Sequence, residues 1–89
     1  MNRWVLTYDY VDDIVTKRAP FREAHLDHAR AALEDERLVM AGAIGDPPHG
    51  ALFVWEVREG IEEWVNADPY VQAGLVTAHR VEPWNVVIG

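Results

Sequence analysis

The central stretch RLVMAGAIGDPPHGALFVWEV, residues 37–57, decides the fold of this chain. Two short apolar runs, residues 37–45 and 51–57, lie on either side of the segment DPPHG. Two prolines restrict φ in that segment, and Asp46 and Gly50 flank them, which is typical of a turn. The stretch therefore predicts two strands joined as a hairpin in the middle of the chain.

The segments on either side of this hairpin each predict one strand and one helix. Residues 3–10 alternate with a period of two, which indicates a half-buried strand, and residues 20–37 are rich in Ala, Leu, Glu and Arg, which favours a helix. A second helix is expected over residues 60–67 and a last strand within residues 75–89.

The resulting order of elements, β-α-β-β-α-β, is the split-βαβ pattern of ferredoxin-like folds. Right-handed crossovers would place both helices on one face of a four-stranded antiparallel sheet, so the expected fold class is α+β. We expect residues 1–89 to form a single domain, because the chain is too short for two.

The same patterns predict how the first helix packs, what covers the sheet face without helices, and how the first strand connects to the first helix. The first helix carries an aliphatic stripe that should pack on the sheet, formed by Leu26, Ala29 and Leu33 and flanked by Phe21 and Ala32. The sheet face without helices should carry alternate residues of aromatic-rich strands and need a cover, so we expect a homodimer with two sheets packed face to face. The acidic segment VDDIVTK is expected to be an irregular link.

Composition restricts the class of partner. The formal net charge of −7, from 15 acidic and 8 basic residues, repels nucleic acid and anionic membranes. The chain has no cysteine, which excludes disulfides, thiol nucleophiles and thiolate metal sites and suits a reducing compartment. No segment approaches the roughly 20 apolar residues of a membrane span. We therefore expect a cytoplasmic protein whose partner is a small molecule.

The start of the first predicted helix holds the densest group of functional side chains. Arg18, Arg22 and His25 follow one another at spacings of four and three, so they should project from one side of this segment. The positive potential of two arginines and a helix N-terminus favours neutral imidazole, which can accept a proton. The alternative is that the arginines pair with surface carboxylates and His25 only packs.

The segment ADPYVQAG, residues 67–74, explains Asp68 as a helix cap. Asp is a good N-cap acceptor, Pro69 suits the first helical position, and Gly74 fits just past the end of a short helix. The predicted order of elements also lets this turn and the start of the first helix reach the same end of the sheet. If Asp68 meets His25 there, the carboxylate would fix the imidazole tautomer and stabilise the imidazolium.

Metal and cofactor sites have little support in the sequence. His28 follows His25 by three residues, which can bring two imidazoles near one metal, but no third ligand is evident. His49 and His79 are candidates only if the fold delivers them. There is no phosphate-binding loop, dinucleotide fingerprint or serine nucleophile elbow. We predict no metal and no cofactor.

Four segments in order, RAPFREAHL, ERLVMAG, WVNADPYVQAGL and VEPW, resemble the YCII-related domain family. The resemblance spans nearly the whole chain. It implies a ferredoxin-like subunit of the dimeric α/β-barrel type and an active site built on a His–Asp pair, here His25 and Asp68. The related barrels include muconolactone isomerases and cofactor-free monooxygenases.

The leading functional hypothesis is a small enzyme that moves a proton on an organic, aromatic-derived substrate, as an isomerase or an eliminating lyase does. His25 would be the general base or acid, and Asp68 would orient it. Arg22, with Arg18 behind it, would hold an anionic oxygen, and Tyr70 would line the pocket or donate a hydrogen bond. The alternatives are a non-catalytic dimer that binds a small anionic ligand, and an accessory subunit of a larger assembly.

Overall fold

A four-stranded antiparallel sheet forms one layer of the fold in the computed structural model, which describes residues 2–89. The strands lie in the order β2-β3-β1-β4, so the predicted central hairpin provides one edge and one inner strand. Their bounds are β1 (Asn2–Tyr10), β2 (Leu38–Ile44), β3 (Gly50–Trp55) and β4 (Val76–Asn85).

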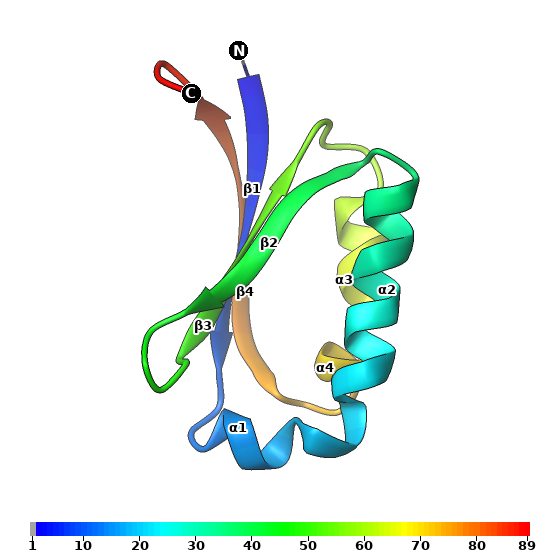
Figure 1. The fold of residues 1–89 in the computed structure, drawn as a ribbon, viewed down its shortest axis with the longest axis vertical. Coiled ribbons are helices and arrows are strands. Elements are labelled where there is room, and N and C mark those ends of the chain that lie inside the picture. The colour runs from blue at the N-terminus through cyan, green and yellow to red at the C-terminus, as the bar shows by residue number, and fades with distance from the viewer. Residues whose placement is uncertain (1) are drawn as a thin grey trace.

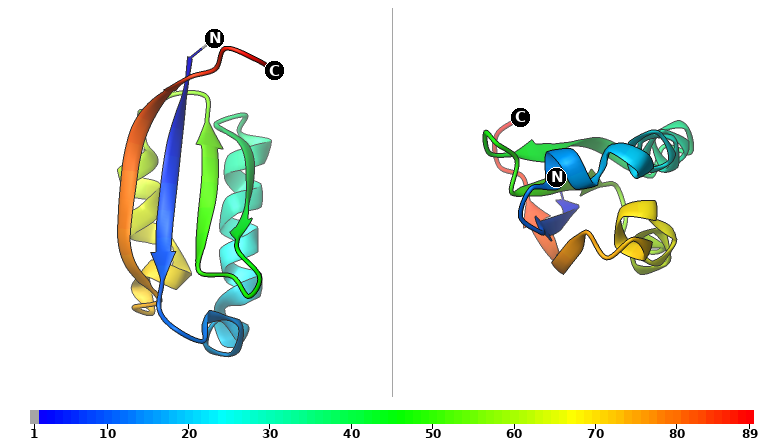
Figure 2. Two further views of the ribbon diagram at one scale, coloured as in Figure 1. Left: turned by 90° about the vertical axis from the view of Figure 1, so that its left-hand side faces the viewer. Right: turned by 90° about the horizontal axis from the view of Figure 1, so that it is seen from below.

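The helices form the second layer. The long helix α2 and the shorter α3 stand side by side on one face of the sheet, and the opposite face carries no helix (Figures 1 and 2). The predicted α+β, ferredoxin-like arrangement is confirmed. The helical segments are α1 (Ile14–Lys17), the 3-10 helix η1 (Ala19–Phe21), α2 (Arg22–Glu34), α3 (Ile61–Ala67) and α4 (Pro69–Gln72).

The connection from β1 to α2 differs from the prediction. The segment expected to be an irregular link contains α1, whose single buried residue, Ile14, packs beside Tyr70 and Leu75. Pro20 lies in η1 and not at the start of α2. Its fixed φ suits the first turn of a helix, and here that turn is η1, which precedes the long helix. Arg18 lies between these two short helical segments, shortly before the N-terminal end of α2.

The core lies between the sheet and the helices and is dominated by aromatic side chains. Because strand side chains alternate, Leu6 and Tyr8 of β1 share the helix-covered face, and both are fully buried. Phe53 and Trp55 of β3 pack beside them, and Trp64 of α3 covers them.

At β1 the bare face carries alternate residues of the strand, as predicted, but these are more polar than a face in need of a cover would suggest. On that face β1 shows Arg3, Val5, Thr7 and Asp9, while its aromatic residues point beneath the helices. The bare face keeps some exposed apolar side chains from both edge strands. These are Met40 and Ile44 of β2 and Trp84 of β4.

The predicted packing stripe of α2 is also only partly correct. Leu33 is 50% exposed, and Phe21 is exposed at the helix start, whereas His25 and Ala32 are the buried residues of this helix. Phe53 and Trp64 already fill the space beneath α2, so the helix approaches them with small or flat side chains.

Within residues 2–89, no helix combines the length and the apolar character needed to cross a bilayer.

Candidate functional site

Asp68 lies between α3 and α4 and is completely buried. Its backbone is extended, and its Oδ1 accepts a hydrogen bond from the backbone N–H of Tyr70 at 3.0 Å. Pro69 occupies the first helical position, so the predicted N-cap of α4 is present. Capping uses only one of the acceptor sites of the carboxylate.

Two side chains from distant parts of the chain use the remaining sites. The Nδ1 of His25 lies 2.8 Å from Oδ1 of Asp68, and the hydroxyl of Tyr8 donates to Oδ2 at 2.7 Å. A carboxylate only accepts, so Nδ1 of His25 carries the proton. Within residues 2–89 no protein group hydrogen-bonds the other ring nitrogen, Nε2, whose lone pair is therefore available.

Aromatic rings hold the imidazole of His25 in place. The ring of Tyr70 stacks on it, with centroids 3.8 Å apart and an interplanar angle of 4°. Phe53 and Trp64 approach it edge-on at 6.1 and 6.4 Å. These contacts leave His25 only 6% exposed. The imidazole is fixed in a largely apolar setting, where electrostatic interactions are stronger than in water.

A cleft of about 310 Å³ opens beside His25. Two guanidinium groups, those of Arg18 and Arg22, and two phenols, those of Tyr10 and Tyr70, lie around it. We call it the His25 cleft; its remaining lining residues are small or apolar, namely Leu26, Ala29, Ala41, Gly42, Ala43, Ala51 and Phe53. The hydroxyl of Tyr70 is buried and makes no well-aligned hydrogen bond among residues 2–89, but the Arg22 guanidinium lies close enough to oppose the rise in its pKa.

Burial keeps the three tyrosines of the site protonated. It raises the pKa of Tyr8 well above the ordinary value, and the negative charge of Asp68 raises it further. Burial also raises the pKa of Tyr10 and of Tyr70, against the opposing effect of the Arg18 guanidinium. At neutral pH each phenol is a neutral hydrogen-bond donor.

The structure brings the five residues singled out from the sequence to one end of the molecule. Arg18, Arg22, His25 and Tyr70 line the His25 cleft, and Asp68 lies behind His25. Two further residues of this region were missed, and both come from β1. Tyr8 contacts Asp68, and Tyr10 lines the cleft. Their alternation in the sequence indicated only a packed strand face.

The other histidines have different surroundings. His28 stacks on Trp64 at 4.6 Å, its Nε2 lies 2.8 Å from the carbonyl oxygen of Trp64, and the Trp64 indole donates back to the carbonyl of His28. His79 lies 3.1 Å from Glu62 near the surface. In the part of the chain that the structure describes, no three His, Cys, Asp or Glu side chains are grouped to hold a metal.

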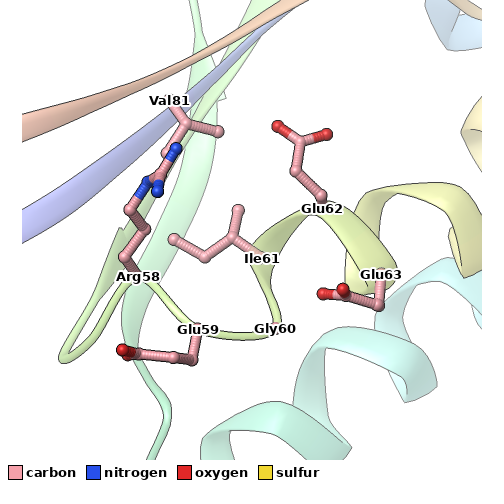
Figure 3. Close-up of a pocket in the computed structure, with 7 residues that line it drawn as sticks. All are labelled: Arg58, Glu59, Gly60, Ile61, Glu62, Glu63 and Val81. Atoms are coloured by element: carbon pink, nitrogen blue, oxygen red, sulfur yellow. The ribbon is translucent and has the colours of Figure 1, made fainter.

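A second pocket, of about 240 Å³, lies at the start of α3 and is separate from the His25 cleft. Figure 3 shows its glutamates, Glu59, Glu62 and Glu63, pointing in different directions from the loop and helix that carry them. Arg58 extends beside Val81 in the same view. Because the carboxylates do not converge, this pocket offers no arrangement for acid–base chemistry.

The fold and the site define a class: a ferredoxin-like α+β domain with a His–Asp pair buried beneath its helices. Residues 1–85 match the YCII-related domain family, and the chain belongs to that family. Protein YciI of Escherichia coli is 31% identical over 86 residues, which cover 84% of this chain and 88% of YciI.

Solved structures share the fold at low sequence identity. A 5-chloro-2-hydroxyhydroquinone dehydrochlorinase from Burkholderia phenoliruptrix, in complex with 2,5-dihydroxybenzoquinone, matches with a TM-score of 0.77 and 19% identity over 93% of each chain. A proposed antibiotic biosynthesis monooxygenase from Deinococcus radiodurans matches with a TM-score of 0.61 and 13% identity over 100% of this chain and 95% of its own. These likenesses concern the fold.

Replacing Asp68 by Ala should destabilise the protein more than replacing it by Asn. Alanine leaves the donors of Tyr8, His25 and Tyr70 without an acceptor, which should lower the free energy of unfolding by about 3 kcal/mol. Asparagine keeps one carbonyl oxygen and should cost about 1 kcal/mol. Urea unfolding measures both, with Asp12→Ala, an exposed carboxylate, as the control. Equal losses for the Ala and Asn variants would contradict this reading of the site.

The protein should lose stability as the pH rises above about 10, the ordinary pKa of tyrosine. The folded state keeps its tyrosine protons there because burial raises the pKa of Tyr8, Tyr10 and Tyr70, while the unfolded state releases them. Urea midpoints measured between about pH 9 and 11 should fall with pH, and Tyr70→Phe should reduce the slope. A flat profile would rule out the protonated, buried phenols.

Proposed function

We propose that this protein is a small enzyme that moves a proton on a small organic substrate carrying an anionic oxygen. His25 is the general base and acid, acting through Nε2, and Asp68 orients it. The observation that carries the proposal is the buried hydrogen bond of 2.8 Å between Nδ1 of His25 and Asp68, which leaves Nε2 available beside a cleft with two guanidinium groups.

The chemistry follows from this arrangement in two steps. Nε2 of His25 takes a proton from a carbon next to a carbonyl, and the electrons of the broken C–H bond move onto the carbonyl oxygen. The resulting imidazolium is stabilised by Asp68. Return of the proton to another carbon completes an isomerisation. On the keto tautomer of a chlorinated, hydroxylated ring, Nε2 instead takes a hydroxyl proton, the O–H electrons form a second carbonyl through the conjugated ring, and chloride leaves with the C–Cl electrons, which completes an elimination.

Arg18, Arg22 and Tyr70 bind the substrate in this proposal. The guanidinium groups stabilise the oxygen on which negative charge develops, because such preorganised positive groups act most strongly where water is excluded. The buried Tyr70 hydroxyl lies beside the Arg22 guanidinium, which can only donate, so its own O–H is a donor that a substrate oxygen would satisfy. A cleft of about 310 Å³ is at the small end for ligand sites and suits a single ring.

The dehydrochlorinase that shares the fold supports the eliminating form of the reaction. Its name describes loss of chloride from a chlorinated, hydroxylated ring, and it was solved with 2,5-dihydroxybenzoquinone. We propose a substrate of similar chemistry for this chain, a planar ring with ionisable oxygens. The two compounds therefore provide the first probes of turnover and of binding.

The protein also forms a homodimer in this proposal, with the bare sheet faces of two copies packed together. Figure 2 shows this face uncovered in front of the helices. It exposes Met40 and Ile44 on one edge strand and Trp84 on the other, and exposed apolar side chains on one uncovered face are typical of an interface. The two halves of such an interface are self-complementary under two-fold symmetry.

His25→Ala should keep the fold and lose turnover. General acid–base help is worth about a hundred- to ten-thousand-fold, so kcat with 5-chloro-2-hydroxyhydroquinone should fall by at least about a hundredfold. Binding of 2,5-dihydroxybenzoquinone, measured by calorimetry, should remain, whereas Arg22→Gln should weaken it. His79→Ala, outside the His25 cleft, is the matched control.

Unchanged turnover in a folded His25→Ala protein would sink the enzymatic proposal. If wild type binds the quinone but turns over neither this substrate nor related hydroxylated rings, the non-catalytic binding module is favoured. That alternative needs Arg18 and Arg22 but has no use for the pairing of His25 with Asp68.

Light scattering after size-exclusion chromatography should report twice the chain mass of 10.1 kDa. Met40→Glu should shift the protein toward the monomer, because a charge on the bare sheet face would be buried without a partner in the dimer. Leu33→Glu, which changes an exposed apolar residue of α2, should leave the dimer intact. A wild-type monomer at high concentration would exclude the dimer.

A further inference from the structure

The hydroxyl of Tyr8 contacts the carboxylate oxygen of Asp68 that does not cap α4. Its hydroxyl donates to Oδ2, whereas His25 and the backbone N–H of Tyr70 both use Oδ1. Tyr8 is fully buried and is absent from the lining of the His25 cleft, so a ligand in the cleft does not touch it. The Tyr8 hydroxyl therefore influences His25 through the carboxylate, whereas the Tyr8 ring reaches it only by packing through Phe53.

We propose that Tyr8 is a positioning residue, which acts through Asp68 to hold His25 in the Nδ1–H tautomer with Nε2 unprotonated toward the cleft. Its importance for catalysis rests on the proposed function, but the positioning itself does not. One carboxylate oxygen is tied to Tyr8, and the other is thereby aimed at both Nδ1 of His25 and the start of α4.

The backbone of Tyr8 is well suited to this role because β1 is an inner strand. Tyr8 pairs with Ala51 of β3 on one side and with His79 of β4 on the other. Gly50 lets β3 approach closely, since a Cβ there would lie 2.4 Å from the carbonyl oxygen of Tyr8. The phenol ring packs edge-on against Phe53 with centroids 4.8 Å apart. The hydroxyl position is thus set by a strand that is paired on both sides and by the packing of the Tyr8 ring.

Asp68 depends on hydrogen bonds because no lysine or arginine contacts it within residues 2–89. Loss of the Tyr8 hydroxyl would leave Oδ2 buried without a donor, which is costly for a charged oxygen. The carboxylate would then turn to bring its second oxygen toward His25, and this change alters the acceptor that Nδ1 faces. Burial raises the pKa of Tyr8, so the hydroxyl remains a donor.

His28 provides an internal reference because it holds the opposite tautomer to His25. Its Nε2 faces the carbonyl oxygen of Trp64 at 2.8 Å, and a carbonyl only accepts, so Nε2 of His28 carries the proton. His25 and His28 should therefore show opposite protonation patterns in one nitrogen NMR spectrum of the same sample. No substrate is required to see them.

The test compares ¹⁵N spectra of histidine-labelled wild type, Tyr8→Phe and Tyr10→Phe, recorded where the histidines are neutral. Tyr10→Phe is the matched control, because it removes a neighbouring phenol hydroxyl that does not contact Asp68. In wild type and the control, Nδ1 of His25 should appear protonated and Nε2 unprotonated. In Tyr8→Phe the two signals should move toward each other, while those of His28 stay in place.

A double variant separates positioning from packing. If Tyr8 acts through the carboxylate, Tyr8→Phe added to Asp68→Ala should leave the His25 signals of Asp68→Ala unchanged, because alanine offers no acceptor to either side chain. A further change of the same size would show that the Tyr8 hydroxyl affects His25 by a route other than Asp68 and would overturn the proposal. So would a folded Tyr8→Phe protein with the wild-type His25 pattern. The ring itself is retained in phenylalanine, so packing alone predicts no shift.

If Tyr8→Phe does not fold, a carbon NMR titration of Tyr8 in the wild type decides the matter. The phenol should remain un-ionised well above about pH 10, the ordinary pKa of tyrosine, because it is buried and because it faces and donates to the negatively charged Asp68. Ionisation near the ordinary value would remove the donor and overturn the proposal. These readouts are independent of turnover, so an absence of catalysis in wild type would end the proposed function without touching this result.

Discussion

The carboxylate of Asp68 is fully buried, and a buried carboxylate is stable only where hydrogen-bond donors surround it. Its donors come from three separate parts of the fold: Tyr8 on β1, His25 on α2 and the backbone N–H of Tyr70 in α4. A shift of the sheet, the long helix or the α3–α4 corner would leave a polar group unpaired in the interior. This one carboxylate therefore ties together the positions of all three elements.

The remaining contacts keep α2 in the place that this arrangement requires. His28 and Trp64 stack and exchange hydrogen bonds with each other's carbonyl groups, which links α2 to α3 about one turn beyond His25. Small or flat residues face the core because Phe53 and Trp64 occupy the space beneath the helix. The same packing leaves a cleft at the other end of the helix, where Arg18 and Arg22 lie.

Membership of the YCII-related domain family and the shared fold do not by themselves assign a reaction, because one fold hosts many activities. The side chains around the His25 cleft are more informative. An imidazole with one fixed tautomer, a carboxylate behind it and two guanidinium groups in front form a set suited to proton transfer beside a developing negative charge. Neutral phenols complete the set as donors.

The sequence by itself determined the order of the elements, the cap at Asp68 and the spacing that puts Arg22 and His25 on one side of a helix, because these depend on local periodicity and turn chemistry. Only the tertiary structure decided which sheet face the helices cover and that Tyr8 reaches Asp68 across 60 residues of sequence. A strand with a period of two presents two faces without saying which is buried, and a hydrogen bond between distant residues leaves no local pattern.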